Sequence, residues 1–193
     1  MNAFSLDRIR DIATAAEAAD GVAPLDEATW LALRHHPEQV DAQVADHGFT
    51  LLIRGELSLV VSPDQRGRGY GDTLARGALE EHTSLAAWSH GDHPAARALA
   101  RRHGFRRVRE LWVMRRPSVD PLPDAVVPEG ITLRGYREGD QPELLRVNAA
   151  AFAAHPEQGA MDATNLDERM AEPWFDPAGL LVATREDRML GFH

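Results

Sequence analysis

The chain has 193 residues and a net charge of −9, and all of its basic side chains other than histidine are arginine. This length is enough for one buried domain, or for one domain and part of another. An acidic chain lacks the positive field that attracts nucleic acid, so we expect no nucleic-acid partner and only a local phosphate site. Cysteine is absent, which excludes a disulfide framework and a thiolate nucleophile and is consistent with a reducing cytoplasm.

Three helices are predicted within the first 46 residues. Apolar residues at helical spacing favour a helix over residues 7–19, with Asp7 as its cap and Gly21 at its end. A second helix is expected from Asp26 to His36, before Pro37, and a shorter one over residues 38–46. No stretch resembles a signal peptide or a membrane-spanning helix, so we expect a cytoplasmic chain without a membrane partner.

Strands and helices alternate in the next segment. Strands are expected at residues 49–54 and 56–61, then a helix at 71–82 and a short strand at 85–88. A further helix is predicted to start at Asp92 or His93, with Pro94 in its first turn, and to end at Gly104. Residues 106–114 are predicted to form the last strand of this part.

Four prolines within residues 117–130 then indicate a semi-extended linker. Beyond Gly130 we expect a strand in ITLRGY, helices over 141–154 and 163–172, a strand over 179–184 and the start of another over 188–193. This order faintly repeats the opening of the first part. The predicted organisation is a first domain over residues 1–116, a linker over 117–130 and a partial second domain over 131–193.

The most informative segment runs from Leu59 to Gly71, where a buried strand enters a turn with alternating glycines that opens a helix. Unpaired N–H groups at a helix start, together with the helix dipole, can bind a phosphate. Glycines allow the backbone to approach a ligand closely, and Arg66 and Arg68 can add charge-assisted bonds. The alternative interpretation is an ordinary glycine-rich turn with two solvated arginines.

Several nucleotide-binding motifs do not fit this turn. A P-loop needs a lysine, which the chain lacks, and the spacing of Gly67, Gly69 and Gly71 is not that of the dinucleotide motif. The turn resembles the R-x-x-G-x-G pyrophosphate loop of the GNAT acetyltransferases, read on Arg66, Gly69 and Gly71. That resemblance implies an acetyl-CoA site in which the strand pairs with the pantetheine arm. The implied cofactor-binding residues are Leu59, Val60, Val61, Arg66, Gly67, Arg68, Gly69, Tyr70, Gly71 and Asp72.

Four longer segments resemble the mycothiol synthase (mycothiol acetyltransferase) family of tandem-domain GNAT enzymes. They are GVAPLDE at 21–27, the stretch from Trp88 to Pro117, ELLRVNAAAFAAHPEQG at 143–159 and EPWFDPAGLLVA at 172–183. The resemblance implies an α/β (α+β) fold, with a mixed central sheet flanked by helices and followed by the first half of a second such domain. It also implies that the family's sequence continues beyond His193, with the chain truncated inside the second domain.

The resemblance further implies an acyltransferase that moves an acetyl group from acetyl-CoA to the cysteinyl amine of a cysteine–glucosamine–inositol conjugate, which gives mycothiol. The family's substrate-contacting acids fall on Glu27 and Glu157. A carboxylate can accept hydroxyl hydrogen bonds and pair with an ammonium. Read without the resemblance, Glu27 is an ordinary first-turn helix acid and Glu157 a solvated loop acid.

Three departures from an active enzyme leave other interpretations open. The first is that the catalytic domain's own pyrophosphate loop, base and acid are expected after His193, so the 193-residue chain has no complete catalytic set. Ala100 occupies the position, four residues before Gly104, where GNAT enzymes often carry a tyrosine that donates a proton to the leaving thiolate. No catalytic residue can therefore be assigned. The predicted strands on either side of Arg54-Gly55 are almost adjacent in the sequence, where GNAT domains usually have an additional strand. One usual strand of the first domain is therefore expected to be missing there. The alternatives are a non-catalytic module that binds acetyl-CoA or only scaffolds, and a GNAT enzyme acting on another small amine.

The remaining polar residues suggest no further partner. The nine histidines form no tight cluster with acids in the sequence, so no metal site is predicted. The four tryptophans are expected in the core rather than stacked on bases. We expect the full-length protein to be a monomer whose partners are acetyl-CoA and a small amine substrate.

Overall fold

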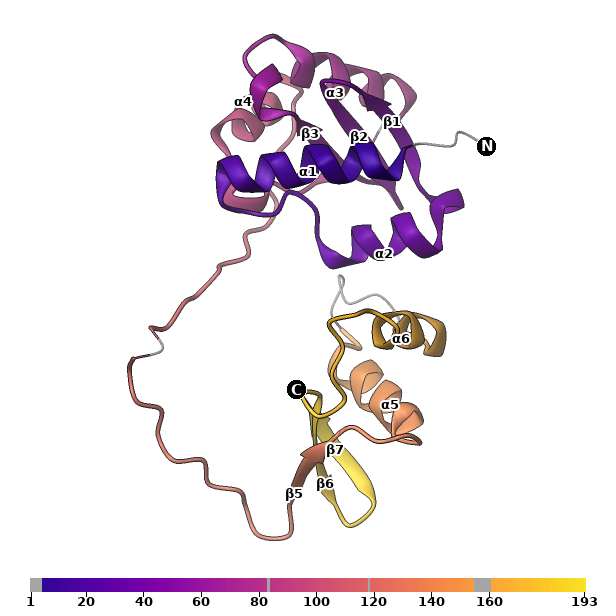
Figure 1. The fold of residues 1–193 in the computed structure, drawn as a ribbon, viewed down its shortest axis with the longest axis vertical. Helices are drawn as coiled ribbons and strands as arrows, with labels where there is room; N and C mark the ends of the chain where they lie inside the picture. The colour runs from indigo at the N-terminus through magenta and orange to yellow at the C-terminus, as the bar shows by residue number, and fades with distance from the viewer. Residues whose placement is uncertain (1–4, 83, 118, 155–160) are drawn as a thin grey trace. The chain divides into compact units, whose positions relative to one another are not determined.

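The computed structural model describes residues 5–82, 84–117, 119–154 and 161–193. Contacts divide the chain into two compact units, residues 1–112 and residues 113–193, and each is described by itself (Figure 1). Among the described residues no helix is both long enough and apolar enough to cross a membrane.

The first unit is built around a mixed four-stranded sheet. In chain order its elements are α1 (Leu6–Asp20), α2 (Glu27–His35), β1 (Asp41–Ala45), β2 (Gly48–Ile53), β3 (Glu56–Val61), α3 (Tyr70–Glu81), β4 (Ala86–Ala87) and α4 (Pro94–Arg102). The strand order is β1-β2-β3-β4. The first three strands form an antiparallel meander, and β4 pairs in parallel with the start of β3.

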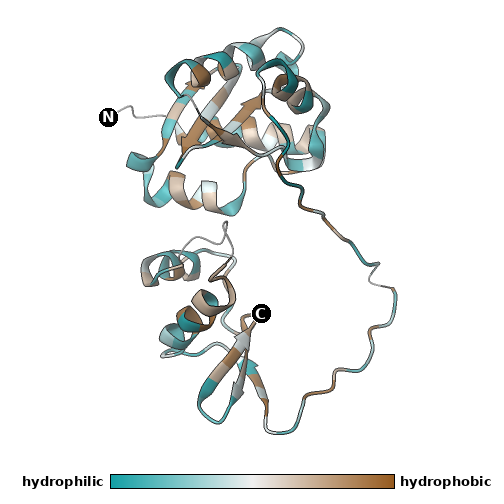
Figure 2. Ribbon diagram, turned by 180° about the vertical axis from the view of Figure 1, so that it is seen from behind, coloured by the Kyte–Doolittle hydropathy of each residue, from teal (hydrophilic) through white to brown (hydrophobic). Residues whose placement is uncertain are grey.

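Helices cover both faces of this sheet because side chains alternate between the faces along each strand. Phe49, Leu51 and Val60 face the buried stripe of α1, and Phe49 is fully buried. On the opposite face α3 packs its buried residues Leu74, Ala75 and Ala78 against β2 and β3. Figure 2 shows these strands as the apolar layer of the first unit.

The helix ends follow local capping chemistry. Ser5, not Asp7 as predicted, is the N-cap of α1, because its hydroxyl accepts a hydrogen bond from the Arg8 N–H. Gly21 ends α1 in the left-handed region, as predicted. Asp26 caps α2, and His93 rather than Asp92 caps α4, where its ring nitrogen accepts from the Ala95 N–H.

Two predicted elements are wrong. The segment 38–46 is not a helix, since a short 3-10 turn at Pro37–Gln39 leads into β1, which pairs along its whole length with β2. Three strands therefore precede the glycine turn, where two were expected, and the tight turn at Arg54-Gly55 joins β2 directly to β3. The segment 106–114 is not a strand: it has no strand partner in the described chain, and its apolar side chains, such as those of Val108 and Met114, are exposed. The predicted strand that the sheet lacks is therefore the one after α4.

The second unit is smaller. Its elements are β5 (Thr132–Gly135), α5 (Gln141–Ala151), α6 (Ala163–Met170), β6 (Leu181–Arg185) and β7 (Arg188–Phe192). The strands form an antiparallel sheet in the order β5-β6-β7. Leu144 of α5 and Leu166 of α6 pack with Val182 and Met189 of the sheet to form the core.

Candidate functional site

The glycine-rich turn between β3 and α3 keeps an open outer surface. Gly67 has a φ angle of +75° and Gly69 one of +89°, a region that side-chain-bearing residues rarely adopt. A Cβ atom on either glycine would meet no protein atom within 4 Å. These glycines are therefore required by the backbone conformation, and the space beside them is available to a ligand.

The main-chain N–H groups of this turn indicate an anion-binding site. In the part of the chain that the structure describes, no protein group accepts a hydrogen bond from the main-chain N–H of any residue from Gly67 to Gly71. Gly69 is the N-cap of α3 and offers no capping side chain. Since a helix start combines unpaired N–H groups with the positive end of the helix dipole, this turn is suited to a phosphate group.

One side of β3 is open next to the turn. β4 pairs with β3 only at Glu56 and Leu57, whereas β2 continues alongside β3 as far as Val61. Main-chain groups alternate sides along a strand, so those of Leu59 and Val61 face the side that β4 has left. The sheet therefore opens beside the turn, and an extended ligand with amide groups can lie along this edge.

The Arg66 side chain is partly exposed and is held against the protein by hydrogen bonds to two other segments. Its guanidinium forms two hydrogen bonds with the carboxylate of Asp20, at 2.6 and 2.8 Å, and its Nε donates to the Val61 carbonyl at 3.2 Å. The hydrogen bond from Arg66 lowers the pKa of Asp20, and the nearby His93 adds a smaller effect. Arg66 thus braces the turn against the end of α1. Arg68, by contrast, is exposed and donates to the side chain of Gln65 at 3.2 Å.

The start of α3 is fixed by three further contacts. The Tyr70 ring stacks on His47 at a centroid distance of 3.9 Å. Asp72 accepts from Arg76 at 2.6 Å and lies 2.9 Å from the His103 ring nitrogen, which ties the end of α4 to the start of α3. The hydrogen bond from Arg76, followed by that from His103 and the charge of Arg102, lowers the pKa of Asp72.

Sequence reasoning missed the partners that support the turn: Asp20, His47 and His103. Only Asp20 carried a signal, because a carboxylate at a helix C-terminus is opposed by the dipole unless a cation lies beside it. The structure brings the predicted cofactor residues together over 59–72. Glu27 is exposed at the first position of α2, and Glu157 lies outside the described residues.

A second grouping also went unforeseen. Asp41, Glu81 and His82 bring one ligand atom each within 4.8 Å of one another. Both acids are exposed, and His82 lies 3.6 Å from the Asp41 carboxylate, a distance that an ion pair explains.

Comparison with known proteins places this geometry in a family. A family model described as "Acetyltransferase (GNAT) family" matches residues 41–105, which run from β1 through the turn to α4. A mycothiol acetyltransferase of a Nocardioides species is 61% identical over 198 residues, covering 97% of this chain and 67% of the relative. The chain belongs to the mycothiol acetyltransferase family. Its Nocardia farcinica member is 46% identical, again over 97% of this chain and 67% of the relative.

The chain spans about two thirds of the length of these relatives. A solved GCN5-related N-acetyltransferase from Sphaerobacter thermophilus matches 95% of this chain and 66% of that chain, with a TM-score of 0.61 and 24% identity. This likeness shows the fold alone. The GNAT fold and the family that the sequence segments indicated are therefore confirmed.

Proposed function

We propose that this protein is an acetyl-CoA-dependent acyltransferase that acetylates the cysteinyl amine of a cysteine–glucosamine–inositol conjugate to give mycothiol. The amine nitrogen, once deprotonated by a base, attacks the thioester carbonyl and forms an amide. The carbon–sulfur bond breaks, and the leaving thiolate of coenzyme A takes up a proton. The family and its relatives' names support this reaction, while the substrate conjugate is the finer part of the proposal.

The observation that carries the acetyl-CoA site is the row of main-chain N–H groups from Gly67 to Gly71, which find no acceptor among the described residues, beside the open side of β3. The pyrophosphate would lie on these N–H groups and the pantetheine arm along Leu59–Val61. Arg68 is exposed at the turn and can add a charge-assisted bond to a phosphate oxygen. Arg66 would act through the backbone, by holding the turn in place.

We further propose that the first unit binds acetyl-CoA and supports chemistry carried out elsewhere in the protein. Ala100 cannot donate a proton to a leaving thiolate, and Tyr70 is stacked on His47. The proposed organisation is a domain over residues 1–116, a linker over 117–130 and part of a second domain over 131–193. Glu27 and Glu157 are proposed to bind the substrate's hydroxyl and ammonium groups.

The acetyl-CoA site is tested by a matched pair of glycine substitutions. Gly69 and Gly55 have similar positive φ angles, +89° and +84°, and neither has a protein atom within 4 Å of an added Cβ. Each change to alanine should therefore cost about 1–2 kcal/mol of stability through backbone strain. Only Gly69→Ala should weaken acetyl-CoA binding in calorimetry, by tenfold or more, because only its methyl group stands in the phosphate path.

Equal acetyl-CoA affinities for Gly69→Ala and Gly55→Ala would contradict the placement of the cofactor at this turn. A second candidate function, a module that binds acetyl-CoA without turnover, is favoured by Ala100. Release of coenzyme A in the presence of the cysteinyl conjugate distinguishes the two. Preferential acetylation of another small amine in the same assay would instead indicate the third interpretation, a GNAT enzyme with a different substrate.

A further inference from the structure

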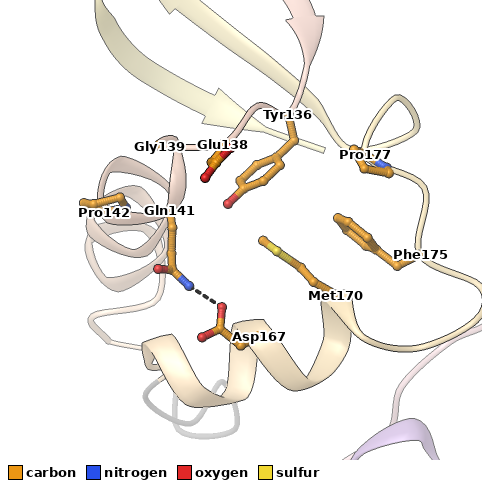
Figure 3. A pocket seen from close by; sticks show the side chains of 9 residues that line it. All are labelled: Tyr136, Glu138, Gly139, Gln141, Pro142, Asp167, Met170, Phe175 and Pro177. Carbon is orange, nitrogen blue, oxygen red and sulfur yellow. Dashed lines mark hydrogen bonds between the residues drawn. The ribbon is translucent and has the colours of Figure 1, made fainter.

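The second unit contains a cavity of about 570 Å³ that the acetyl-CoA site does not use. It lies between the β5–α5 connection, helix α6 and the segment that leads from α6 to β6 (Figure 3). This volume is within the range of small-molecule pockets, which is about 300–1,000 Å³. The residues that matter for its chemistry are Tyr136, Glu138, Gln141, Asp167, Met170 and Phe175.

The inner wall of the pocket is aromatic and apolar. The rings of Tyr136 and Phe175 meet edge to face, with centroids 6.5 Å apart, and the thioether of Met170 lies beside them (Figure 3). The Tyr136 N–H donates to the carbonyls of Pro177 and Leu180, at 3.0 and 2.8 Å. The main chain thus fixes the base of the Tyr136 side chain, whose hydroxyl points into the space enclosed by the labelled residues (Figure 3).

The rim of the pocket is negatively charged. Glu138 and Asp167 both line it, and none of its lining residues is an arginine, lysine or histidine. Gln141 donates to Oδ1 of Asp167 at 2.6 Å, which orients this carboxylate, and no residue of the described chain donates a hydrogen bond to its second oxygen. The nearby Arg134 is bound by Asp140, with Nη2 donating to Oδ1 at 2.7 Å, so its charge is already paired.

The surroundings of Tyr136 agree with this electrostatic picture. Burial, followed by the negative charges of Asp140, Asp167 and Glu138, raises the pKa of the Tyr136 phenol. The part of this effect that comes from the three carboxylates, unlike the part that comes from burial, also favours a cation in the same space. Aromatic faces add to that attraction, because a cation within about 6 Å of a ring is stabilised by the ring quadrupole.

We infer that this pocket binds a small organic cation, a primary ammonium group on a short carbon skeleton. The ammonium bonds the Asp167 carboxylate and is further attracted by the negative charge of Glu138 on the same pocket lining, and the carbon skeleton packs on Met170 and the two rings. The same chemistry is offered by a free alkylamine and by an amino sugar. The inference does not depend on the acetyl-CoA site, which lies in the other unit.

The test is a titration of the 15N-labelled 193-residue chain with n-butylammonium chloride, followed by amide NMR. Shifts are expected at Tyr136, Gly139 and Gln141, whereas n-butanol, its neutral counterpart, should leave these signals in place. The double variant Glu138→Gln with Asp167→Asn should weaken binding at least fivefold. Asp187→Asn, which neutralises an exposed acid in the β6–β7 turn, is the matched control and should leave the affinity unchanged.

Absent shifts at the pocket, equal binding of n-butanol, or full affinity in the double variant would each overturn the inference. The NMR spectrum itself reports whether a variant is folded. Glucosamine hydrochloride supplies the second arm: tighter binding than n-butylammonium assigns the pocket to an amino sugar, and weaker binding assigns it to an alkylamine. The Gly69→Ala chain should bind n-butylammonium normally, so that failure of the acetyl-CoA site and failure of this pocket remain distinguishable.

Discussion

Arg66 has a structural task that its place in a phosphate-binding motif conceals. Its planar guanidinium engages both oxygens of Asp20, 46 positions earlier in the chain, and also the carbonyl at the end of β3. Such a fork-to-fork pair fixes orientation as well as distance. Asp20 in turn is the last residue of α1, where the helix dipole disfavours a carboxylate, and Arg66 and His93 offset that effect.

This pair gives the first unit an acid-dependent contribution to stability. The pKa of Asp20 is held below its ordinary value of 3.8, so the contribution is present above pH 3.8 and is lost as the pH falls through the lowered pKa. At pH 7 we expect Asp20→Asn to melt lower by about 4–8 °C, equivalent to about 1 kcal/mol for a partly exposed pair. Thermal melting between pH 7 and pH 2 checks this.

The difference in melting temperature between the wild type and Asp20→Asn should become smaller as the pH drops below 3.8, because the protonated carboxyl no longer pairs with Arg66 as an anion. Asp11→Asn, which changes an exposed acid of the same helix, is the control and should follow the wild type. A gap that stays constant over the whole pH range would show that the asparagine acts through packing rather than charge.

Two glycines in regular elements show how context decides the effect of one methyl group. Gly48 begins β2, and a Cβ there would overlap the Val60 carbonyl oxygen of the neighbouring strand, which is backbone and cannot rotate away. Gly77 lies inside α3, where a Cβ would make an ordinary contact of 3.5 Å with the Gln43 side chain. The first glycine is required by packing, and the second is not.

Opposite stability changes are therefore expected for the same substitution. Gly77→Ala should stabilise the first unit by about 0.5–1 kcal/mol, because alanine loses less backbone freedom in a helix than glycine does. Gly48→Ala should destabilise it by about 1–3 kcal/mol through overpacking. Urea unfolding measures both. Destabilisation by Gly77→Ala would mean that α3 lies closer to β1 than the Gln43 contact indicates.

At the level of elements, the sequence predicted those helices and strands whose formation depends on neighbouring residues, and it failed where an element depends on pairing with a distant segment. The apolar stripe and left-handed glycine of α1 placed that helix within a residue at each end. β1 could not be predicted in this way, since the helix-tolerant residues of DAQVA become a strand only by pairing with β2. The reverse holds for 106–114, whose strand-forming residues pair with no strand in the described chain.

The same distinction between local and long-range structure applies to the candidate site. Glycine spacing predicted the turn, because φ angles are a local property of the backbone. The supporting contacts Arg66–Asp20, Tyr70–His47 and Asp72–His103 join residues that are far apart in the sequence, and no periodicity reports them. The pocket of the second unit could not be predicted from the sequence for the same reason, since its lining residues come from three separate segments.

At the scale of the whole molecule, residues 106–117 and 119–131 form the longest part of the described chain that lies outside helices and strands. Their apolar side chains are largely exposed, that of Trp112 by 81% and that of Met114 by 90%. Extended, exposed backbone is where proteases cut first. The proposed boundary between a domain ending at residue 116 and a linker over 117–130 can therefore be tested by digestion.

Brief trypsin treatment should cleave first between Arg106 and Arg116 and leave a resistant fragment that contains α1 to α4. Mass spectrometry of the first products identifies the cut. Replacing both Arg115 and Arg116 with glutamine should move cleavage to the arginines between 106 and 109 and leave the resistant fragment otherwise the same. First cuts inside the helices of residues 6–102 would contradict the proposed domain.

The bridge between Arg66 and Asp20 also has an evolutionary consequence. An alignment restricted to the glycine turn would treat position 66 as part of a ligand-binding motif. The charge of Arg66 is instead paired with Asp20, at the end of a helix that lies outside the motif. Substitutions at the two positions should be correlated among relatives, with a neutral residue at 66 accompanied by loss of the acid at 20.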